Sequence, residues 1–164
     1  MEIKKISNIF LFITIISAFF LIYLWYKDYK FNNSALDEKI IKKIEAKTKE
    51  LKALAYKNYN ITYNIPIIIS DKMKNNLFGM AIFNKKDVAI YLNKNRFKEN
   101  LEYMIEDTLP HEYAHAIMFL LGDFSNENAG HTLKWENICK NLQGKRCDRF
   151  VTHDDIIIEK TNPF

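Results

Sequence analysis

The sequence is poor in the residues that interrupt or cross-link a chain. Its 164 residues include two cysteines, three prolines and four glycines, with no internal repeat and no low-complexity tract. Repeat architectures are therefore excluded, and one intramolecular disulfide is the most that can form. When an N-terminal apolar segment is set aside, about 130 residues remain, a usual size for a single domain. The chain thus predicts one compact domain with one appendage.

The appendage is a long run near the N-terminus that lacks charge. Ile9 to Tyr26 contains no charged residue, and at 1.5 Å per residue a helix of this length spans about 27 Å, just enough to cross a bilayer. Its phenylalanines face all sides, which disfavours an amphipathic surface helix, and Tyr23, Trp25 and Tyr26 could form an interfacial aromatic belt. We predict a single-pass membrane anchor over residues 1–30 that contacts lipid.

A cleaved signal peptide is the alternative for this segment, with Lys4 and Lys5 as its basic start. No Ala-x-Ala-like cleavage site follows the apolar run, so an uncleaved anchor is favoured. Lysines flank the run on both sides, and the positive-inside rule therefore gives no clear orientation.

The two cysteines bear on the orientation. Cys139 and Cys147 are separated by a segment containing Gly144, and they could close a disulfide in an oxidising compartment. They could equally remain two thiols, one packed on a helix and one in a loop. The disulfide would favour a domain outside the cytoplasm.

Positive charge is concentrated in one segment. Between Lys27 and Lys57 there are nine lysines against five acidic residues, which accounts for the net charge of +4. Apolar residues recur at helical spacing after a cap box at Ser34, which predicts a basic amphipathic helix whose lysines form a solvated outer face. Attraction to anionic lipid headgroups is a functional alternative. Nucleic-acid binding is disfavoured, because acids are interspersed and no basic-aromatic platform is present.

The central stretch predicts a small three-stranded sheet. Residues 61–69, 80–83 and 88–92 are rich in β-branched, aromatic or other apolar residues, and residues 84–87 have the composition of a hairpin turn. Pro66 should lie at an edge or bulge, since it cannot donate a ladder hydrogen bond.

The strongest signal for chemistry is a histidine pair. His111 and His115 lie four residues apart around Glu112, so on a helix both imidazoles project from one face and can bind one Zn²⁺. Three protein ligands leave the fourth position of zinc to a water, whose pKa the metal lowers toward about 7. Glu112 is adjacent to a ligand and can act as the general base. Apolar neighbours argue against a chance match on a polar helix face.

His131 is the predicted third ligand. It follows a loop, Gly122 to Gly130, whose composition predicts a reversal of the chain toward the first histidine pair. Glu136 and Glu127 are the alternatives, since zinc also accepts carboxylate ligands. His153, near an acidic pair, is predicted to lie on the surface.

Pro110 precedes the histidine pair directly. Proline inside a helix removes a backbone hydrogen bond and clashes with the preceding turn, but it is well tolerated in a first turn. We therefore expect helices over Phe97–Asp107 and His111–Leu121, with Pro110 starting or bending the second.

The motifs together resemble the SprT-like zinc metalloproteases. That family has an HExxHA helix and a later His-Gly-x-x-Trp/Phe helix, and this chain has His111-Glu112-Tyr113-Ala114-His115-Ala116, then Gly130-His131-Thr132-Leu133-Lys134-Trp135 and Leu142-Gln143-Gly144. Phe78-Gly79-Met80-Ala81 and Ala89-Ile90-Tyr91-Leu92-Asn93 resemble the family's hairpin. The resemblance covers about residues 38–150. It implies His111, His115 and His131 as zinc ligands and Glu112 as the catalytic acid and base.

Two features depart from the family pattern. Thr132 stands where glycine is usual, and the chain ends without the cysteine-rich zinc ribbon of many members. The missing ribbon weakens the expectation of DNA-linked substrate recruitment, although the family resemblance still allows a nucleic-acid partner.

We therefore predict an α+β fold, with an N-terminal transmembrane helix and a minimal zincin-like domain over residues 34–164. The predicted function is zinc-dependent hydrolysis of peptide bonds in a protein or peptide substrate, which pairs with an edge strand of the sheet. The alternatives are a catalytically silent zinc-binding scaffold at the membrane and a zinc hydrolase of a non-peptide amide bond.

Overall fold

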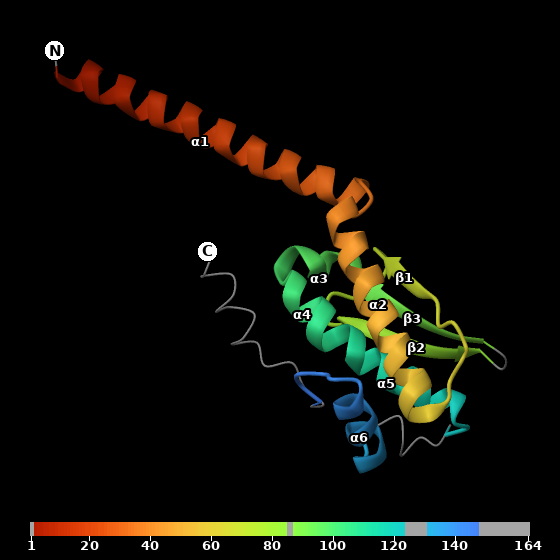
Figure 1. Ribbon diagram of the computed structural model, residues 1–164. Helices are drawn as coiled ribbons and strands as arrows, with labels where there is room; N and C mark the ends of the chain where they lie inside the picture. Colours follow the sequence, from red (N-terminus) through yellow and green to blue (C-terminus); the bar gives the residue numbers. More distant parts are fainter. Residues whose placement is uncertain (1, 85–86, 124–130, 148–164) are drawn as a thin grey trace. The chain divides into compact units, whose positions relative to one another are not determined.

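The computed structural model describes residues 2–84, 87–123 and 131–147, and the chain separates into two compact units between Leu36 and Asp37 (Figure 1). The first unit is one helix, α1 (Glu2–Asn33). Residues Lys5–Asn33 of this helix are long and apolar enough to cross a membrane, although a signal sequence would pass the same test. The expected N-terminal apolar helix is therefore present.

The second unit combines a small sheet with helices. In chain order its elements are α2 (Glu38–Tyr59), β1 (Ile67–Ser70), β2 (Gly79–Asn84), β3 (Asp87–Asn93), α3 (Lys94–Glu99), α4 (Leu101–Tyr103), the π-helical stretch η1 (Met104–Thr108), α5 (Leu109–Leu120) and α6 (Leu133–Asn141). The strand order is β1-β3-β2, with β1 parallel and β2 antiparallel to β3. The predicted α+β fold with a three-stranded sheet is confirmed.

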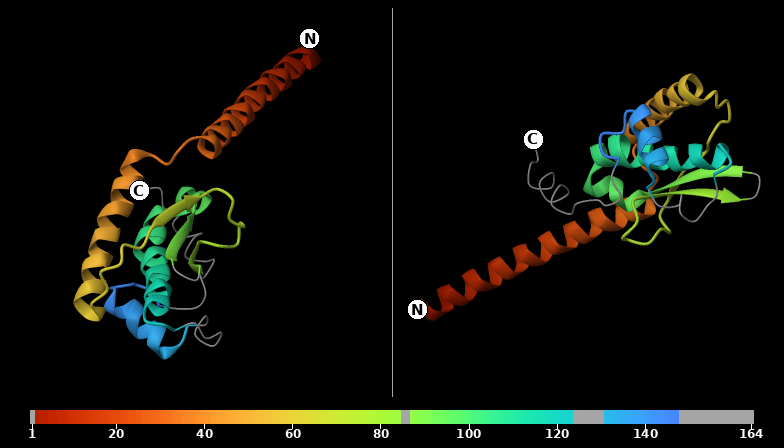
Figure 2. Two further views of the ribbon diagram at one scale, coloured as in Figure 1. Left: turned by 90° about the vertical axis from the view of Figure 1, so that its right-hand side faces the viewer. Right: turned by 90° about the horizontal axis from the view of Figure 1, so that it is seen from below.

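Helix α5 occupies the centre of this unit. It contacts β2 and β3 on one side and α2 and α6 on others (Figure 2). The central strand β3 alternates from Val88 to Leu92, so that Val88, Ile90 and Leu92 are buried while Ala89 and Tyr91 are only partly covered. Such alternation is what a strand with one face on a core produces. Burial of this face and of the apolar face of α2 holds the sheet and α2 around α5.

The first strand is shorter than predicted. Of the segment 61–69, only the part from Ile67 onward pairs as β1, because Asn60 ends α2 in a left-handed conformation (φ 56°) and the chain then runs without regular pairing to Pro66. Pro66 precedes this edge strand, and its carbonyl accepts a hydrogen bond from Ile90 N–H at 2.9 Å. The segments 80–83 and 88–92 lie inside β2 and β3 as predicted. Residues 85 and 86 of the expected turn lie outside the described residues.

Helix α2 departs from its prediction at two residues. Its N-cap is Asp37, whose carboxylate accepts Lys39 N–H at 2.8 Å, and not Ser34. Lys47 is buried and not solvated, because its Nζ lies 3.1 Å from Glu50 and 3.0 Å from Glu106. Burial alone would lower the pKa of Lys47, but the hydrogen bonds and negative charges of these two glutamates outweigh it and raise the pKa.

The helix predicted over 97–107 is interrupted at Asn100. This buried residue has an extended backbone (φ −152°), and its side-chain oxygen accepts Tyr103 N–H at 2.6 Å, so one helix ends there and another begins. An asparagine that offers its own acceptor to the next helix competes with continuation of the first.

Pro110 lies in the first turn of α5, as predicted. At the end of the preceding π-helical stretch, Leu109 N–H donates a hydrogen bond to the carbonyl of Met104, five residues earlier. In a continuous α-helix the proline ring would clash with the carbonyl four residues before it. The wider turn ahead of Pro110 lets the chain continue into α5 without that clash.

Helix α6 begins at the residue that departs from the family pattern. Thr132 is its N-cap, with an extended backbone (φ −73°, ψ 167°) and a hydroxyl that accepts Trp135 N–H at 3.3 Å. This conformation needs no glycine, and a threonine side chain satisfies a backbone N–H that glycine would leave without a side-chain partner.

Replacing this cap tests its contribution. We expect Thr132→Ala to lower the free energy of unfolding by about 1 kcal/mol, because the N-terminal N–H groups of α6 lose their side-chain acceptor. Thr132→Ser is the matched control and should retain most of the stability. Urea unfolding of the full chain in detergent micelles, followed by circular dichroism, measures both; equal losses would argue against a capping role.

Candidate metal centre

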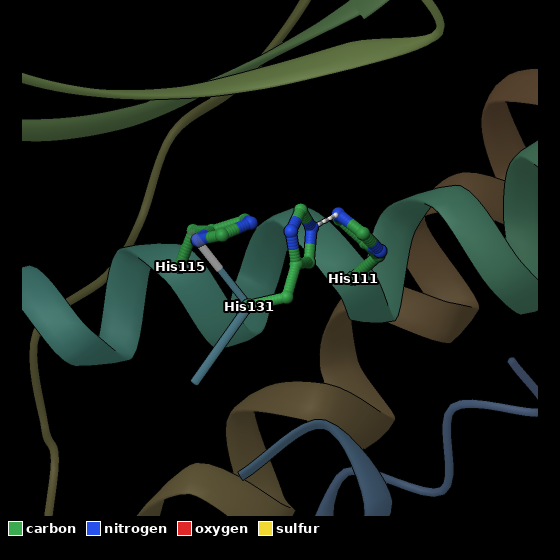
Figure 3. A group of neighbouring side chains, drawn as sticks. All are labelled: His111, His115 and His131. Atoms are coloured by element: carbon green, nitrogen blue, oxygen red, sulfur yellow. Dashed lines mark hydrogen bonds between the residues drawn. The ribbon is translucent and has the colours of Figure 1, made fainter. Parts of the chain in front are cut away.

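Helix α5 presents its two histidines on one face. His111 and His115 are one helical turn apart, and their ring centroids are 5.1 Å from each other (Figure 3). The helix is held in this orientation because Ala114, Ala116 and Ile117 are completely buried around it. Both histidines are only partly buried, so the pair lies at the boundary of the core.

His131 meets this pair from the other side. It lies just before the N-cap of α6, and its Nε2 is 2.9 Å from His111 Nε2 (Figure 3). One possible ligand atom from each of the three histidines lies within 4.8 Å of the others. The structure thus brings together the three residues predicted as metal ligands, and they could bind a metal.

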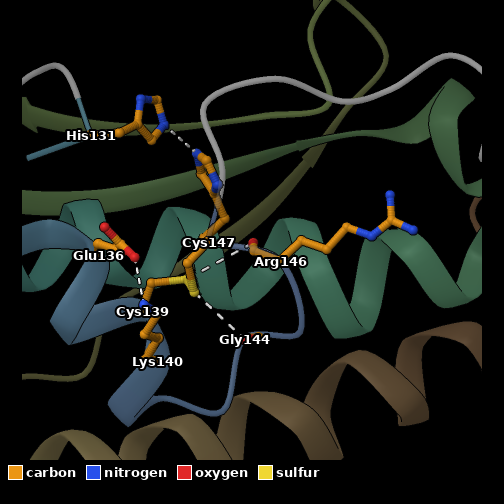
Figure 4. The surroundings of a disulfide bond; sticks show 8 residues. His131, Glu136, Cys139, Lys140, Gly144, Arg146 and Cys147 are labelled. Atoms are coloured by element: carbon orange, nitrogen blue, oxygen red, sulfur yellow. Dashed lines mark hydrogen bonds and ion pairs between the residues drawn. A yellow bond between two sulfur atoms is a disulfide. The ribbon is translucent and has the colours of Figure 1, made fainter. Parts of the chain in front are cut away.

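The other candidates are not in this group. Glu136 lies on α6 and pairs with Lys140 one turn later (Figure 4). Glu127 and His153 lie outside the described residues.

The protonation of the histidines suits metal binding. Burial, and then the proximity of His115 and His131, lowers the pKa of His111 to about 3. Burial and His131 lower the pKa of His115 to about 4. Near neutral pH both rings are therefore neutral, the form in which imidazole binds a metal. The donor set of three imidazoles fits zinc.

Glu112 points the other way, toward the sheet. It is 8% exposed, and its Oε2 accepts Ala81 N–H of β2 at 3.0 Å. Burial raises the pKa of Glu112 to about 7, although the hydrogen bond from Ala81 acts in the opposite direction. A carboxyl group with this pKa can both accept and release a proton near neutral pH.

Gly79 allows this close approach of α5 and β2. A Cβ atom at Gly79 would lie 2.6 Å from Cγ and 3.0 Å from Oε1 of Glu112. No local sequence pattern assigns a role to Gly79 or Ala81, because both are far from Glu112 in the chain; Ala81 is 31 residues away from it. The only sequence signal was their place in the hairpin that resembles the family's.

The ring of Trp135 contacts the rings of all three histidines. Its ring centroid lies 4.6 Å from that of His111, 5.1 Å from His115 and 4.3 Å from His131, and the residue is completely buried. The motif in the sequence included Trp135 without indicating this function. One aromatic ring in contact with all three imidazoles restricts their rotation, so the cluster is held before any metal binds.

A disulfide fixes the end of α6. Cys139 is bonded to Cys147, with Cα atoms 5.8 Å apart, and Gly144 packs against Cys139 Sγ (Figure 4). The buried Asp107 of η1 accepts the backbone N–H of Arg146 in the same loop. Burial raises the pKa of Asp107, although the charges of Arg146 and Lys145 partly offset this effect. The loop after α6 is thus tied both to α6 and to η1.

The fold and the three-histidine cluster are those of a metallopeptidase-like domain. A sequence profile of the SprT-like family matches residues 38–155, most of the chain, so the protein belongs to the SprT-like family. A comparison with curated proteins finds no match. The predicted family is therefore confirmed, and the family is associated with zinc.

Substitution of Trp135 tests whether it holds the cluster. We expect Trp135→Ala to weaken Zn²⁺ binding roughly 10- to 100-fold, the range found when supporting residues around metal ligands are removed. Leu142→Ala is the matched control, because Leu142 is equally buried and its loss should cost about 2–5 kcal/mol of stability without changing the affinity. Competition with a chromophoric chelator measures the affinity; an equal decrease in both variants would contradict the supporting role.

Proposed function

We propose that the domain is a zinc-dependent metallopeptidase that hydrolyses peptide bonds with water as the nucleophile. The observation that carries the proposal is the convergence of three imidazoles beside Glu112, a buried carboxyl group that can exchange a proton near neutral pH. His111, His115 and His131 would hold the metal. Bound Zn²⁺ would supply a Lewis acid that polarises the scissile carbonyl and makes water more acidic.

Glu112 is the proposed acid and base. It follows His111 directly in α5, so a rotation of its side chain away from β2 would bring it beside the cluster without making it a ligand. It would take the proton of the attacking water and pass it to the leaving amine. A pKa of about 7 suits both steps, since a general base works best when its pKa is near the operating pH.

The edge strand β2 is the proposed site of substrate pairing. It lies at one edge of the sheet, and Asn93 N–H donates to Phe78 O at 2.8 Å, so the backbone groups of residues 80, 82 and 84 face β3. Those of residues 79, 81 and 83 then face away from the sheet, because neighbouring residues in a strand alternate in direction. An extended peptide could add there through backbone hydrogen bonds, which tolerate many sequences.

The N-terminal helix α1 is proposed to anchor the domain to a membrane, so that it acts on proteins at or near the bilayer surface. The disulfide between Cys139 and Cys147 supports a domain outside the cytoplasm, where disulfides persist.

Glu112→Gln tests the catalytic proposal. We expect cleavage of reduced, carboxymethylated casein by the zinc-loaded full chain to fall at least about 100-fold, because general acid-base catalysis contributes that much or more. Zn²⁺ should remain bound, since Glu112 is not a ligand. Glu136→Gln is the matched control, because Glu136 pairs with Lys140 on the surface of α6, and it should leave both cleavage and zinc binding unchanged.

The alternatives give different results in the same assay. If the zinc-loaded wild-type protein cleaves no protein substrate, a silent scaffold is favoured. If it releases amines only from non-peptide amides, it is a zinc hydrolase of another class.

The cysteine pair tests the proposed location. In intact cells that produce the full chain, Cys139 and Cys147 should resist alkylation until a reductant is added, because the disulfide forms in an oxidising compartment. Cys139→Ser should make Cys147 react without reduction. Mass spectrometry of the alkylated peptides measures this, and free thiols in the wild-type protein would place the domain in the cytoplasm.

A further inference from the structure

The carboxylate of Glu112 rests on the backbone of β2. Its Oε2 accepts Ala81 N–H at 3.0 Å, and the space that a side chain at Gly79 would fill lies 3.0 Å from its Oε1. Both oxygens of Glu112 therefore lie against the strand. Since Glu112 is 8% exposed, this N–H helps to compensate for the burial of its carboxylate.

The donor that Glu112 uses lies on the edge of β2 that faces away from β3. Ala81 is paired with Ile90 across the sheet, at a position where the two residues exchange no ladder hydrogen bonds, so its N–H points away from β3. A peptide that extends the sheet at this edge needs the same N–H as a donor for one of its carbonyl groups. Glu112 and a bound peptide cannot both have this hydrogen bond at full strength.

We propose that Ala81 N–H is exchanged between the two partners: Glu112 holds it in the free protein, and the backbone carbonyl of an extended peptide takes it on binding. The exchange frees the carboxylate from β2 for the histidine cluster only when a substrate strand is present. This inference rests on the proposed function, because it specifies how that site responds to an extended peptide. Gly79 is a positioning residue in it, since any side chain there would displace Glu112 before a peptide arrives.

The sequence allows one amide to be observed alone. Met80–Ala81 is the only Met-Ala step in the chain, so [1-¹³C]Met with [¹⁵N]Ala labelling isolates the Ala81 amide in a carbonyl-selected NMR spectrum. Its hydrogen exchange can be followed in the full chain in detergent micelles. We expect exchange to become roughly tenfold faster, or more, in Glu112→Ala, because a hydrogen bond to a charged group is lost.

Two further variants separate this bond from general loosening of the structure. Gly79→Ala should speed the exchange of Ala81 although Glu112 is still present, because the new Cβ moves the carboxylate. Asn84→Ala, at an exposed residue of the same strand, should have no effect. Equal exchange rates for Ala81 in the wild type and in Glu112→Ala would overturn the proposal.

The exchange of partners is tested by binding to reduced, carboxymethylated casein. Glu112→Ala and Glu112→Gln should both be inactive, but only glutamine keeps an acceptor for Ala81. We expect Glu112→Ala to bind casein roughly tenfold more tightly than Glu112→Gln does, because in the alanine variant no side chain competes with the peptide for the hydrogen bond. The Ala81 amide of Glu112→Ala should regain protection from hydrogen exchange when casein binds. Equal affinities, or no binding by either variant, would overturn the exchange.

Failure of this inference is distinguishable from failure of the proposed function. If the wild-type protein cleaves casein in a zinc-dependent way and Ala81 does not respond to Glu112→Ala, the exchange alone is wrong. If Ala81 responds and the wild-type protein cleaves nothing, the contact is real and the peptidase proposal is wrong.

Discussion

The contact between α5 and the edge strand β2 is the constraint on which the site depends. One helix must direct two histidines toward α6 and, from the residue between them in the motif, a carboxylate toward the sheet. Around the helix axis Glu112 is rotated by about 100° from His111 and by about 60° from His115, because successive residues on a helix are rotated by about 100°. The helix can serve both sides only if the strand approaches it closely, and Gly79 makes that approach possible.

The same packing sets the chemistry of the side chains. Burial shifts the pKa of His111 and His115 downward and that of Glu112 upward, so near neutral pH both histidines are uncharged and Glu112 is about half protonated. The histidines are thereby kept available for a cation. Lys47 differs from these residues, because it is buried in its charged form and is stabilised there by ion pairs with two glutamates. These covered ionisable groups are thus either shifted toward the neutral form, as in His111 and Glu112, or paired with opposite charge, as in Lys47.

Local sequence patterns predicted the elements that depend on local physics. The alternation in 88–92 and the histidine spacing in α5 are properties of a strand and a helix by themselves, and they were identified correctly. The errors occurred where a distant partner decides the outcome. Residues 61–65 have strand-like composition but do not pair, and Ile65 is buried without a ladder. Lys47 is buried because Glu106, 59 residues away, meets it, and no local pattern contains that information. The contact of Glu112 with Ala81 was missed for the same reason.

The π-helical stretch before Pro110 has a consequence for how the histidine motif can be used. A turn that closes over five residues in place of four contains one residue more than an α-turn. Removing one residue from Met104–Thr108 would leave an ordinary α-turn there, in which the ring of Pro110 clashes with the carbonyl four residues before it. His111 and His115 would keep their own spacing, but the start of their helix would have to bend or break to relieve that clash. The path of the helix that carries the motif therefore depends on the segment ahead of it, so that two chains with the same histidine spacing can differ in whether a third ligand is within reach.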